Sequence, residues 1–354
     1  MGLPEIIIDL NKIRQNTETV LALARPFGIE VVGVTKVFLG EPRIAGAMLA
    51  GGVRMLADSR LENLFKLKQA FPDVPLMLLR LPGISQVEET VRLAKVSLNS
   101  EIRVLEALAA EGRNQGKVHG VIVMVDLGDL REGVWPEDLP DFIGQVLPLE
   151  GIKLQGLGVN LACYGGVVPT EANLGRLVEL AASLEEKFEI RLPVISGGNS
   201  ASLPLLLEQR MPADVNQLRV GEGIVLGRET VKRQIIPGAA GDAFTLRAEI
   251  LEAHEKPSVP IGEVGQDAFG QVPAFVDEGR RRRGILALGR QDVPTEGLSP
   301  RDGRLKIIGA SSDHLIVDLS GASELEIGSV LEFDLSYGGL LGAMTSPYVH
   351  KRYI

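Results

Sequence analysis

The sequence predicts an α/β protein with a (β/α)8 TIM-type barrel followed by a mainly β C-terminal domain. Short apolar runs alternate with longer helical patterns from residue 5 to about residue 230. Eight such runs over this length favour a closed barrel of parallel strands over an open sheet. Near residue 235 the pattern changes to short strands and turns. We therefore predict a barrel over residues 1–234 and a mainly β domain over residues 235–354.

The expected barrel strands are short and nearly all apolar, as strands buried on both faces are. They span residues 30–35, 54–57, 75–79, 96–98, 119–126, 154–160, 193–196 and 216–220. Helical patterns cover residues 43–50, 61–70, 86–94, 102–111 and 174–188, and a further helix over 10–24 precedes the first strand. This alternation predicts right-handed βαβ units.

The second domain is expected to follow a linker at residues 235–238. Its expected strands span residues 244–251, 283–287, 305–308, 315–319 and 330–335. Short strands separated by turns are typical of a mainly β domain. The basic run at residues 280–283 is interpreted as a solvated turn or an interface patch.

Composition and charge indicate an ordinary globular protein. The 354 residues exceed one typical core, so two domains are expected. A net charge of -9 argues against nucleic acid or an anionic membrane as the main partner. The single cysteine, Cys163, allows no intramolecular disulfide and suits a reducing cytoplasm. We expect neither a signal peptide nor a membrane-spanning segment.

Lys36 follows the first expected barrel strand. Ligands of α/β barrels bind at the carboxyl ends of the strands, so this lysine is expected near the site. Apolar neighbours around its stem would remove part of the hydration of the ammonium and lower its pKa, which suits a nucleophile or a Schiff-base partner. The alternative is a lysine that emerges at the strand end and points to water.

Two glycine-rich loops follow the seventh and eighth expected strands, at residues 197–202 and 219–223. Loops in these positions frequently bind phosphate, because glycines let backbone N–H groups approach an anion. Ser200 adds a hydroxyl donor, and it would begin a helix over residues 201–208 whose N-terminus favours an anion. Ordinary turn chemistry between strand and helix would produce the same residue types.

The loop after the fifth expected strand, residues 126–133, contains Arg131. An arginine there can form a bidentate pair with a substrate carboxylate. It can also pair with Asp126, Asp129 or Glu132 of its own loop. A lysine, a phosphate-binding loop and an arginine on one barrel face together suggest pyridoxal 5'-phosphate (PLP) bound as a Schiff base.

At this point the chain resembles the alanine racemase family of PLP enzymes, which has a barrel followed by a β domain. The resemblance spans almost the whole chain. It is carried by Val34-Thr35-Lys36, Asp58-Ser59-Arg60, Asn199-Ser200-Ala201, Arg219-Val220-Gly221, and residues 309–314 and 317–319. Residues 33–38, 126–133 and 311–314 are more closely similar to the ornithine racemase branch.

The resemblance implies how the cofactor is held. Lys36 would form the Schiff base and act as one of two bases. Asn199, Ser200 and the backbone of Gly221 and Glu222 would hold the phosphate.

The resemblance also implies groups around the cofactor ring and the substrate. Arg219 would face the pyridine nitrogen and keep it unprotonated, because two cations in contact are costly. Asn160 stands where the family has a histidine against the ring. Arg131 would orient the substrate carboxylate. Ser311, Ser312 and Asp313 would arrive from the partner subunit of a homodimer, with the site at the subunit interface.

The chain departs from the family at the second base. The family uses a tyrosine in a Gly-Tyr-Ala-Asp-Gly segment, whereas the matching stretch here begins Gly289-Arg290-Gln291 and has no tyrosine. A racemase needs a proton-transfer group on each face of the α-carbon. Replacement candidates are Tyr337 and Asp292 as catalytic groups, with Tyr164 and Arg290 as substrate contacts. A modified lysine of the family is replaced by Met124.

The expected function is racemisation of an amino acid, most simply ornithine or another basic one, by removal and return of the α-proton. Acidic residues near the expected site loops could pair with a distal ammonium: Asp129, Glu132, Glu222 and Asp292. Alternatives are a racemase of alanine or of broad specificity, a non-catalytic PLP-homeostasis protein, and a fold-related decarboxylase. The four histidines have no metal-ligand spacing, so no metal is expected.

Overall fold

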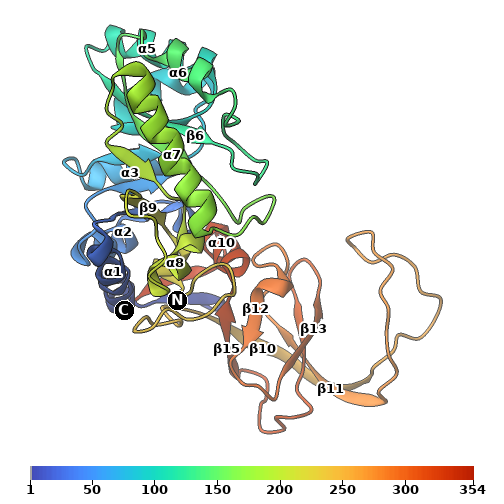
Figure 1. The fold of residues 1–354 in the computed structure, drawn as a ribbon. Coiled ribbons are helices and arrows are strands. Elements are labelled where there is room, and N and C mark those ends of the chain that lie inside the picture. Colours follow the sequence, from blue (N-terminus) through green and yellow to red (C-terminus); the bar gives the residue numbers. More distant parts are fainter. Residues whose placement is uncertain (1) are drawn as a thin grey trace. The chain divides into compact units, whose positions relative to one another are not determined.

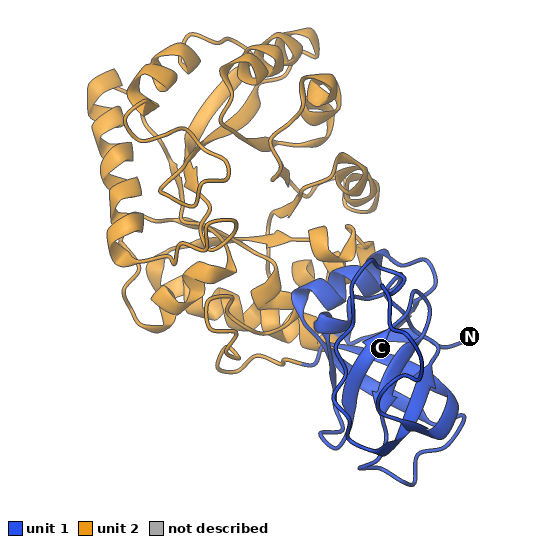
Figure 2. Cartoon of the chain, turned by 90° about the vertical axis from the view of Figure 1, so that its right-hand side faces the viewer, with its two compact units in different colours: residues 1–10, 242–354 blue, residues 11–241 orange. Residues whose placement is uncertain are grey.

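The computed structural model describes residues 2–354, which form two compact units (Figure 2). The barrel unit is Asn11–Gly241, and the β unit combines residues 2–10 with Asp242–Ile354. The division therefore falls after Gly241 rather than after Gln234, and the first residues belong with the C-terminal part. No helix within residues 2–354 has the length and apolar character that a bilayer span requires.

The barrel unit contains a closed barrel of eight parallel strands, β2 to β9 in chain order (Figure 1). The strands are β2 Glu30–Val34, β3 Leu56–Asp58, β4 Leu76–Leu78, β5 Val96–Asn99, β6 His119–Val125, β7 Ile152–Val159, β8 Val194–Ser196 and β9 Gln217–Val220. The barrel closes through pairing of β2 with β9. The predicted (β/α)8 barrel is confirmed.

Helices precede and separate these strands. They are α1 Leu10–Ala24, α2 Pro42–Ala50, α3 Leu61–Ala70, α4 Val87–Leu93, α5 Ile102–Asn114, α6 Leu139–Val146, α7 Glu171–Phe188, α8 Leu203–Leu207 and α9 Glu222–Val225. Alternate strand residues point inward, as Val32 and Val34 do in a cluster that includes the fully buried Met124. Outward residues pack against helices, as Val121 does against Leu105 of α5.

The helix expected over residues 201–208 begins differently. A 3-10 turn, Ser200–Ser202, comes first, and α8 starts at Leu203. Asn199 caps the turn, because its side-chain Oδ1 accepts the Ala201 N–H at 2.8 Å. Pro204 has no N–H and cannot donate an α-helical hydrogen bond back to Ser200, which explains the later start.

The β unit is built on a mixed sheet with strand order β12-β15-β10-β11-β14-β13. Strand β1 pairs antiparallel with β10 and parallel with β16. The elements are β1 Glu5–Ile8, β10 Phe244–Pro257, β11 Arg280–Leu286, β12 Leu298–Pro300, β13 Lys306–Ala310, β14 Leu315–Asp318, β15 Val330–Leu335, α10 Tyr337–Thr345 and β16 His350–Tyr353. The predicted mainly β character of this part is confirmed.

The basic run at residues 280–283 is not a turn, as the sequence suggested, but the start of β11. It pairs antiparallel with β10. The guanidinium of Arg282 donates to the carbonyl oxygens of Ala322 (3.3 Å), Ser323 (2.9 Å) and Leu325 (2.5 Å). Arg282 therefore binds backbone carbonyls of a neighbouring segment, which a run of like charges in the sequence does not indicate.

Candidate active site

Lys36 lies at the carboxyl end of β2, where it begins a 3-10 turn, Lys36–Phe38. The turn ends at two positive-φ residues, Leu39 at 57° and Gly40 at 63°. Gly40 is needed there because a Cβ would come within 2.9 Å of the Asn63 Cβ. This sharp change of direction keeps Lys36 at the end of the barrel strand.

Part of the Lys36 residue is exposed to solvent, but protein atoms surround its ammonium group closely enough to change its pKa. Loss of hydration lowers the pKa of Lys36. Three neighbouring groups also act on this pKa: Cys163 and Asp58 raise it, and Arg131 lowers it. A larger fraction of Lys36 is therefore the neutral amine than for a lysine in water.

Arg219 of β9 is buried and joins three neighbouring strands at their carboxyl ends. Its guanidinium donates to the Val159 carbonyl at 2.7 Å and to the hydroxyl of Ser196. Burial lowers the pKa of Arg219 to about 10, so the group still carries its charge at neutral pH. Arg219 is therefore a fixed cation, and its charge also lowers the pKa of Lys36.

The loop after β8 is tied to the loop after β7 through Asn199. The Asn199 amide nitrogen donates to Oδ1 of Asn160 at 2.8 Å and to the Leu161 carbonyl at 3.0 Å. Its oxygen caps the following turn, so both ends of the amide hold the chain in place. Asn199 and Asn160, both predicted to bind the cofactor, are thus in direct contact.

Ser200 lies in contact with the start of α9. The Gly223 N–H donates to the buried Ser200 hydroxyl oxygen at 3.1 Å, which leaves the hydroxyl hydrogen for another acceptor. At Gly221 a Cβ would lie 3.1 Å from the Val34 Cβ, so this turn passes close to the end of β2. Glu222 pairs with Arg233, and burial raises the pKa of Glu222 while Arg233 lowers it.

Arg131 is engaged within its own loop. Its guanidinium forms a two-point ion pair with the Glu132 carboxylate, and its Nη1 donates to the Cys163 Sγ at 2.8 Å. The Asn160 amide lies beside the same pair. Of the two uses that the sequence left open for Arg131, the structure contains the pairing with Glu132.

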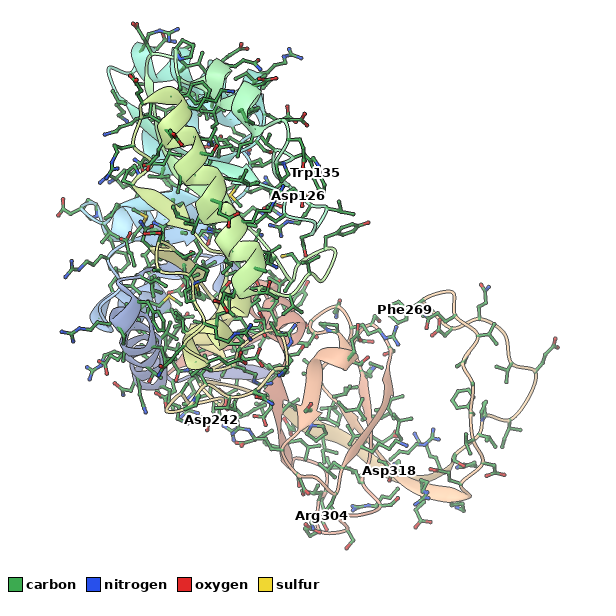
Figure 3. All side chains as sticks on the ribbon, viewed as in Figure 1. Asp126, Trp135, Asp242, Phe269, Arg304 and Asp318 are labelled. Atoms are coloured by element: carbon green, nitrogen blue, oxygen red, sulfur yellow. The ribbon has the colours of Figure 1, made fainter. Side chains whose placement is uncertain are left out.

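Asp129 anchors the loop after β7 to the loop after β6. Its buried carboxylate accepts the backbone N–H groups of Cys163 (3.3 Å), Tyr164 (2.9 Å) and Val167 (3.1 Å). Burial acts to raise the pKa of Asp129, but these hydrogen bonds hold it below its usual value. The Tyr164 side chain is 78% exposed. Figure 3 labels Asp126 and Trp135, which belong to the loop after β6.

The candidates from the β unit form a second group. The Arg290 N–H donates to the Ser311 carbonyl at 3.0 Å. The hydroxyls of Ser311 and Ser312 both donate to Oδ1 of Asp313, at 3.3 and 3.1 Å. The Arg290 guanidinium lies over the Phe269 ring at 4.5 Å, on the loop between β10 and β11 (Figure 3).

Asp292 and Tyr337 differ in their surroundings. The buried Asp292 carboxylate accepts the Gly289 N–H at 3.2 Å and the Ser346 hydroxyl at 2.8 Å, so it stabilises a turn. These bonds make Asp292 a poor candidate for a base. Tyr337 begins α10 after the cap residue Ser336.

The structure brings one residue to the barrel site that the sequence did not single out for chemistry. Cys163 contacts Arg131 and affects the charge of Lys36. Its only signals in the sequence were that it is the sole cysteine and that it follows the sixth barrel strand. Among the described residues, no group of three or more histidine, cysteine, aspartate or glutamate side chains is placed to hold a metal ion.

Residues 8–229 match the family model of the alanine racemase N-terminal domain. The chain belongs to the alanine racemase family. It is 44% identical to an ornithine racemase of Acetoanaerobium sticklandii over 98% of this chain and 99% of that protein. It is 39% identical to a lysine racemase of Thermotoga maritima over 100% of this chain and 99% of that protein. The predicted likeness to this family and to ornithine racemase is confirmed.

The fold agrees with that of solved members of the alanine racemase family. An alanine racemase from Bartonella henselae, described with covalently bound pyridoxal phosphate, superposes with a TM-score of 0.77 over the full length of both chains. The two sequences are 16% identical, so this likeness concerns the fold alone.

Proposed function

We propose that the protein is a PLP-dependent racemase that interconverts the L and D enantiomers of a basic amino acid, with ornithine as the first candidate. Two observations support the proposal. The chain matches racemases of ornithine and of lysine over almost its full length, and it keeps a lysine of lowered pKa at the end of the first barrel strand. The reaction is an isomerisation, so it needs proton transfer but no oxidant or second substrate.

The chemistry of the donor set fits PLP. Lys36 offers an amine of lowered pKa for a Schiff base with the aldehyde. The buried Ser200 hydroxyl, beside the start of α9, offers a hydrogen-bond donor for a phosphate. Arg219 offers a buried cation for the ring nitrogen, where it disfavours protonation. When bound, the cofactor withdraws electrons from the amino acid and weakens its Cα–H bond.

The protein residues would then position the amino acid and move one proton. Arg131 would bind the substrate carboxylate after exchanging its pairing with Glu132, because both carboxylates compete for the same guanidinium. The Lys36 amine would take the α-proton from one face of the carbon or return it there. A second group is required on the opposite face.

Charge around the site supports a basic substrate. Asp129 and Asp292, two of the four acidic candidates, already accept several hydrogen bonds from the protein. Glu132 and Glu222 instead pair with arginines whose side chains are 40% and 58% exposed, so a distal ammonium of the substrate can replace either arginine. We propose Glu132 or Glu222 as its partner.

A test of the reaction uses L-ornithine, L-lysine and L-alanine, each incubated with the PLP-loaded protein in D2O. Loss of optical rotation together with deuterium at the α-carbon is expected for at least one basic amino acid, and more slowly for alanine. Unchanged rotation and no deuterium across the panel would refute the racemase and favour a non-catalytic PLP protein. Release of carbon dioxide would indicate a decarboxylase instead.

The covalent anchor can be tested separately. Borohydride reduction of the PLP-treated protein is expected to label one peptide, the one that contains Lys36, and the label should vanish in Lys36→Ala. Lys66→Ala is a matched control, because Lys66 lies on the exposed face of α3. A label that maps to another lysine in the wild-type protein would contradict this assignment.

We also propose a homodimer in which the loop Ser311, Ser312 and Asp313 of one subunit completes the barrel site of the other. The two sets of candidates lie in different units of the chain. Lys36→Ala and Asp313→Ala variants should each be inactive, and mixing them under conditions of subunit exchange should restore about a quarter of the activity. No recovery in verified mixed dimers would contradict a shared site. The cytoplasmic location stays a prediction.

A further inference from the structure

Racemisation needs a proton-transfer group on each face of the α-carbon, and Lys36 supplies only one. The tyrosine that the family uses for the second face is missing from residues 289–293. Among the candidates from the sequence, Asp292 is held by two hydrogen bonds and Arg290 is a poor base at neutral pH. The barrel site itself contains a further group of suitable chemistry, the thiol of Cys163.

Cys163 is held in a defined position. The Asp129 carboxylate accepts the N–H groups of Cys163 and of two later residues of the same loop, Tyr164 and Val167, and the Asp129 carbonyl accepts the Gly165 N–H at 2.9 Å. The preceding residue, Ala162, has a positive φ of 52°, so the chain turns sharply just before the thiol. A loop with its backbone fixed in this way presents its side chain with little loss of entropy on binding.

The thiol of Cys163 contacts a charged group of the barrel site. Its sulfur accepts a hydrogen bond from the Arg131 guanidinium at 2.8 Å, and a neighbouring arginine stabilises a thiolate. Arg131, which contacts the thiol, is also the arginine that we propose for the substrate carboxylate, and this places the thiol next to the group that the α-carbon carries. Glu132, the partner of Arg131, and Arg219 are the other charged groups of this cluster.

We propose that Cys163 is the second proton-transfer group of the racemase, acting on the face of the α-carbon opposite Lys36. This inference rests on the proposed function. It also gives Arg131 a second task beside the orientation of the substrate carboxylate, which is to hold the thiolate.

The proton balance closes with these two residues. In one direction the Cys163 thiolate takes the α-hydrogen as a proton, so that a C–H bond breaks and an S–H bond forms. The protonated amine of Lys36 gives its proton to the other face of the same carbon, and a new C–H bond forms. In the other direction the neutral amine accepts and the thiol donates. The thiol then gives its proton to water and the Lys36 amine takes one from water, which restores the starting pair, and no electron leaves or enters.

The decisive experiment compares Cys163→Ala and Cys163→Ser with the wild-type holoenzyme. Racemisation of ornithine should fall by about 10²–10⁴-fold, the usual contribution of a general acid or base. Exchange of the α-hydrogen with D2O should survive for the one enantiomer whose hydrogen faces Lys36, and it should be lost for the other. A merely structural role would reduce both exchange reactions together, and that result would overturn the proposal.

Two comparisons separate this inference from the proposed function. Racemisation by Cys163→Ala within threefold of the wild-type rate would overturn the role of the thiol and leave the racemase intact. Absence of racemisation and of exchange in the wild type would overturn both. If Tyr337→Phe loses α-hydrogen exchange for one enantiomer only, and Cys163→Ala exchanges both enantiomers as the wild type does, the second face is assigned to Tyr337 instead.

A measurement without substrate tests the contact with Arg131. Because Cys163 is the only cysteine, iodoacetamide labels a single site, and its rate is read by mass spectrometry at pH 7.5. Arg131→Met should slow the labelling by roughly fivefold or more, since the thiolate is the reactive form. Circular dichroism serves to verify that the variant is folded. An unchanged rate in the folded variant would overturn the role of Arg131 as the group that holds the thiolate.

Discussion

The hydroxyl of Thr35 donates a 2.5 Å hydrogen bond to Oδ2 of the buried Asp58 carboxylate. Oδ1 of the same group accepts the Arg60 N–H and the Asn63 side chain, both at 3.0 Å. Strands β2 and β3 and the start of α3 are thereby joined at the residue that precedes Lys36. Burial raises the pKa of Asp58, although these hydrogen bonds act to lower it. The network fixes the end of the strand from which Lys36 extends.

Replacing Thr35 by valine removes the hydroxyl and keeps the volume of the side chain. The free energy of unfolding should fall by about 1–3 kcal/mol, because one oxygen of the buried carboxylate loses its donor. Urea denaturation followed by circular dichroism measures this change. Thr345→Val is the control and should change stability by about 0.5 kcal/mol or less, since its exposed hydroxyl bonds only carbonyls of its own helix. Equal losses in the two variants would contradict a special role for Thr35.

Asn16 ties α1 to the segment around the phosphate-binding loop. Its amide nitrogen donates to the carbonyls of Ile224 (2.8 Å) and Ala240 (2.9 Å), and its oxygen accepts the Ala240 N–H at 2.7 Å. Asn16→Ala should lower the free energy of unfolding by about 2–3 kcal/mol and weaken PLP binding, because Ile224 belongs to α9. Gln15→Ala, at an exposed neighbouring position, should leave both unchanged. Fluorescence titration with PLP would reveal whether the two losses occur together, as expected.

Gly289 allows the loop of Ser311 to Asp313 to approach the Arg290 segment. A Cβ on Gly289 would lie 2.2 Å from the Ser312 carbonyl oxygen, so Gly289→Ala must displace this loop. The KM for the substrate should rise by about tenfold or more, whereas PLP binding by the barrel should not change. Gly303→Ala is the matched control, because its Cβ would meet nothing within 4 Å. A KM unchanged by Gly289→Ala would exclude this loop from substrate binding.

His119 makes the protein sensitive to acid. Its Nε2 hydrogen-bonds with the Ser97 hydroxyl at 2.8 Å, and burial lowers its pKa to about 4. The unfolded chain therefore takes up a proton below about pH 6.5 while the folded protein does not, so stability falls as the pH decreases from 6.5 to 4.

This loss amounts to roughly 3 kcal/mol at pH 4, and His119→Gln should remove most of it. Denaturant melts at pH 7, 5.5 and 4.5 measure the slope. His254→Gln, at an exposed position of β10, should keep the wild-type slope. A wild-type slope in His119→Gln would show that other groups cause the acid sensitivity.

The barrel could be predicted because its strands are buried on both faces. Every residue of β6, His119–Val125, is buried, and such a run stands out in a sequence. Lys36 and Arg219 follow from the same signal, since the end of an apolar run places them at the carboxyl ends of strands. Helix α6 gave a weaker signal, because it has only eight residues and contains a proline in its first turn.

The contact between Arg131 and Cys163 could not be predicted. It joins two loops that are 32 residues apart in the sequence, and it depends on the Asp129 anchor, which has no periodic pattern. Strand β1 was missed for a related reason. It has four residues, and both of its partners, β10 and β16, lie far along the chain.

The position of β1 affects the order in which the two units are completed during synthesis. The barrel unit, Asn11–Gly241, is continuous and leaves the ribosome before the rest of the β unit. Strand β1 emerges first, yet Glu5 pairs with Arg247 of β10 and with His350 of β16. Its backbone donors and acceptors must wait, unpaired, until both partners have been made. Removal of β16 would therefore leave a permanent open edge on β1 and favour aggregation of nascent chains whose barrel has already formed.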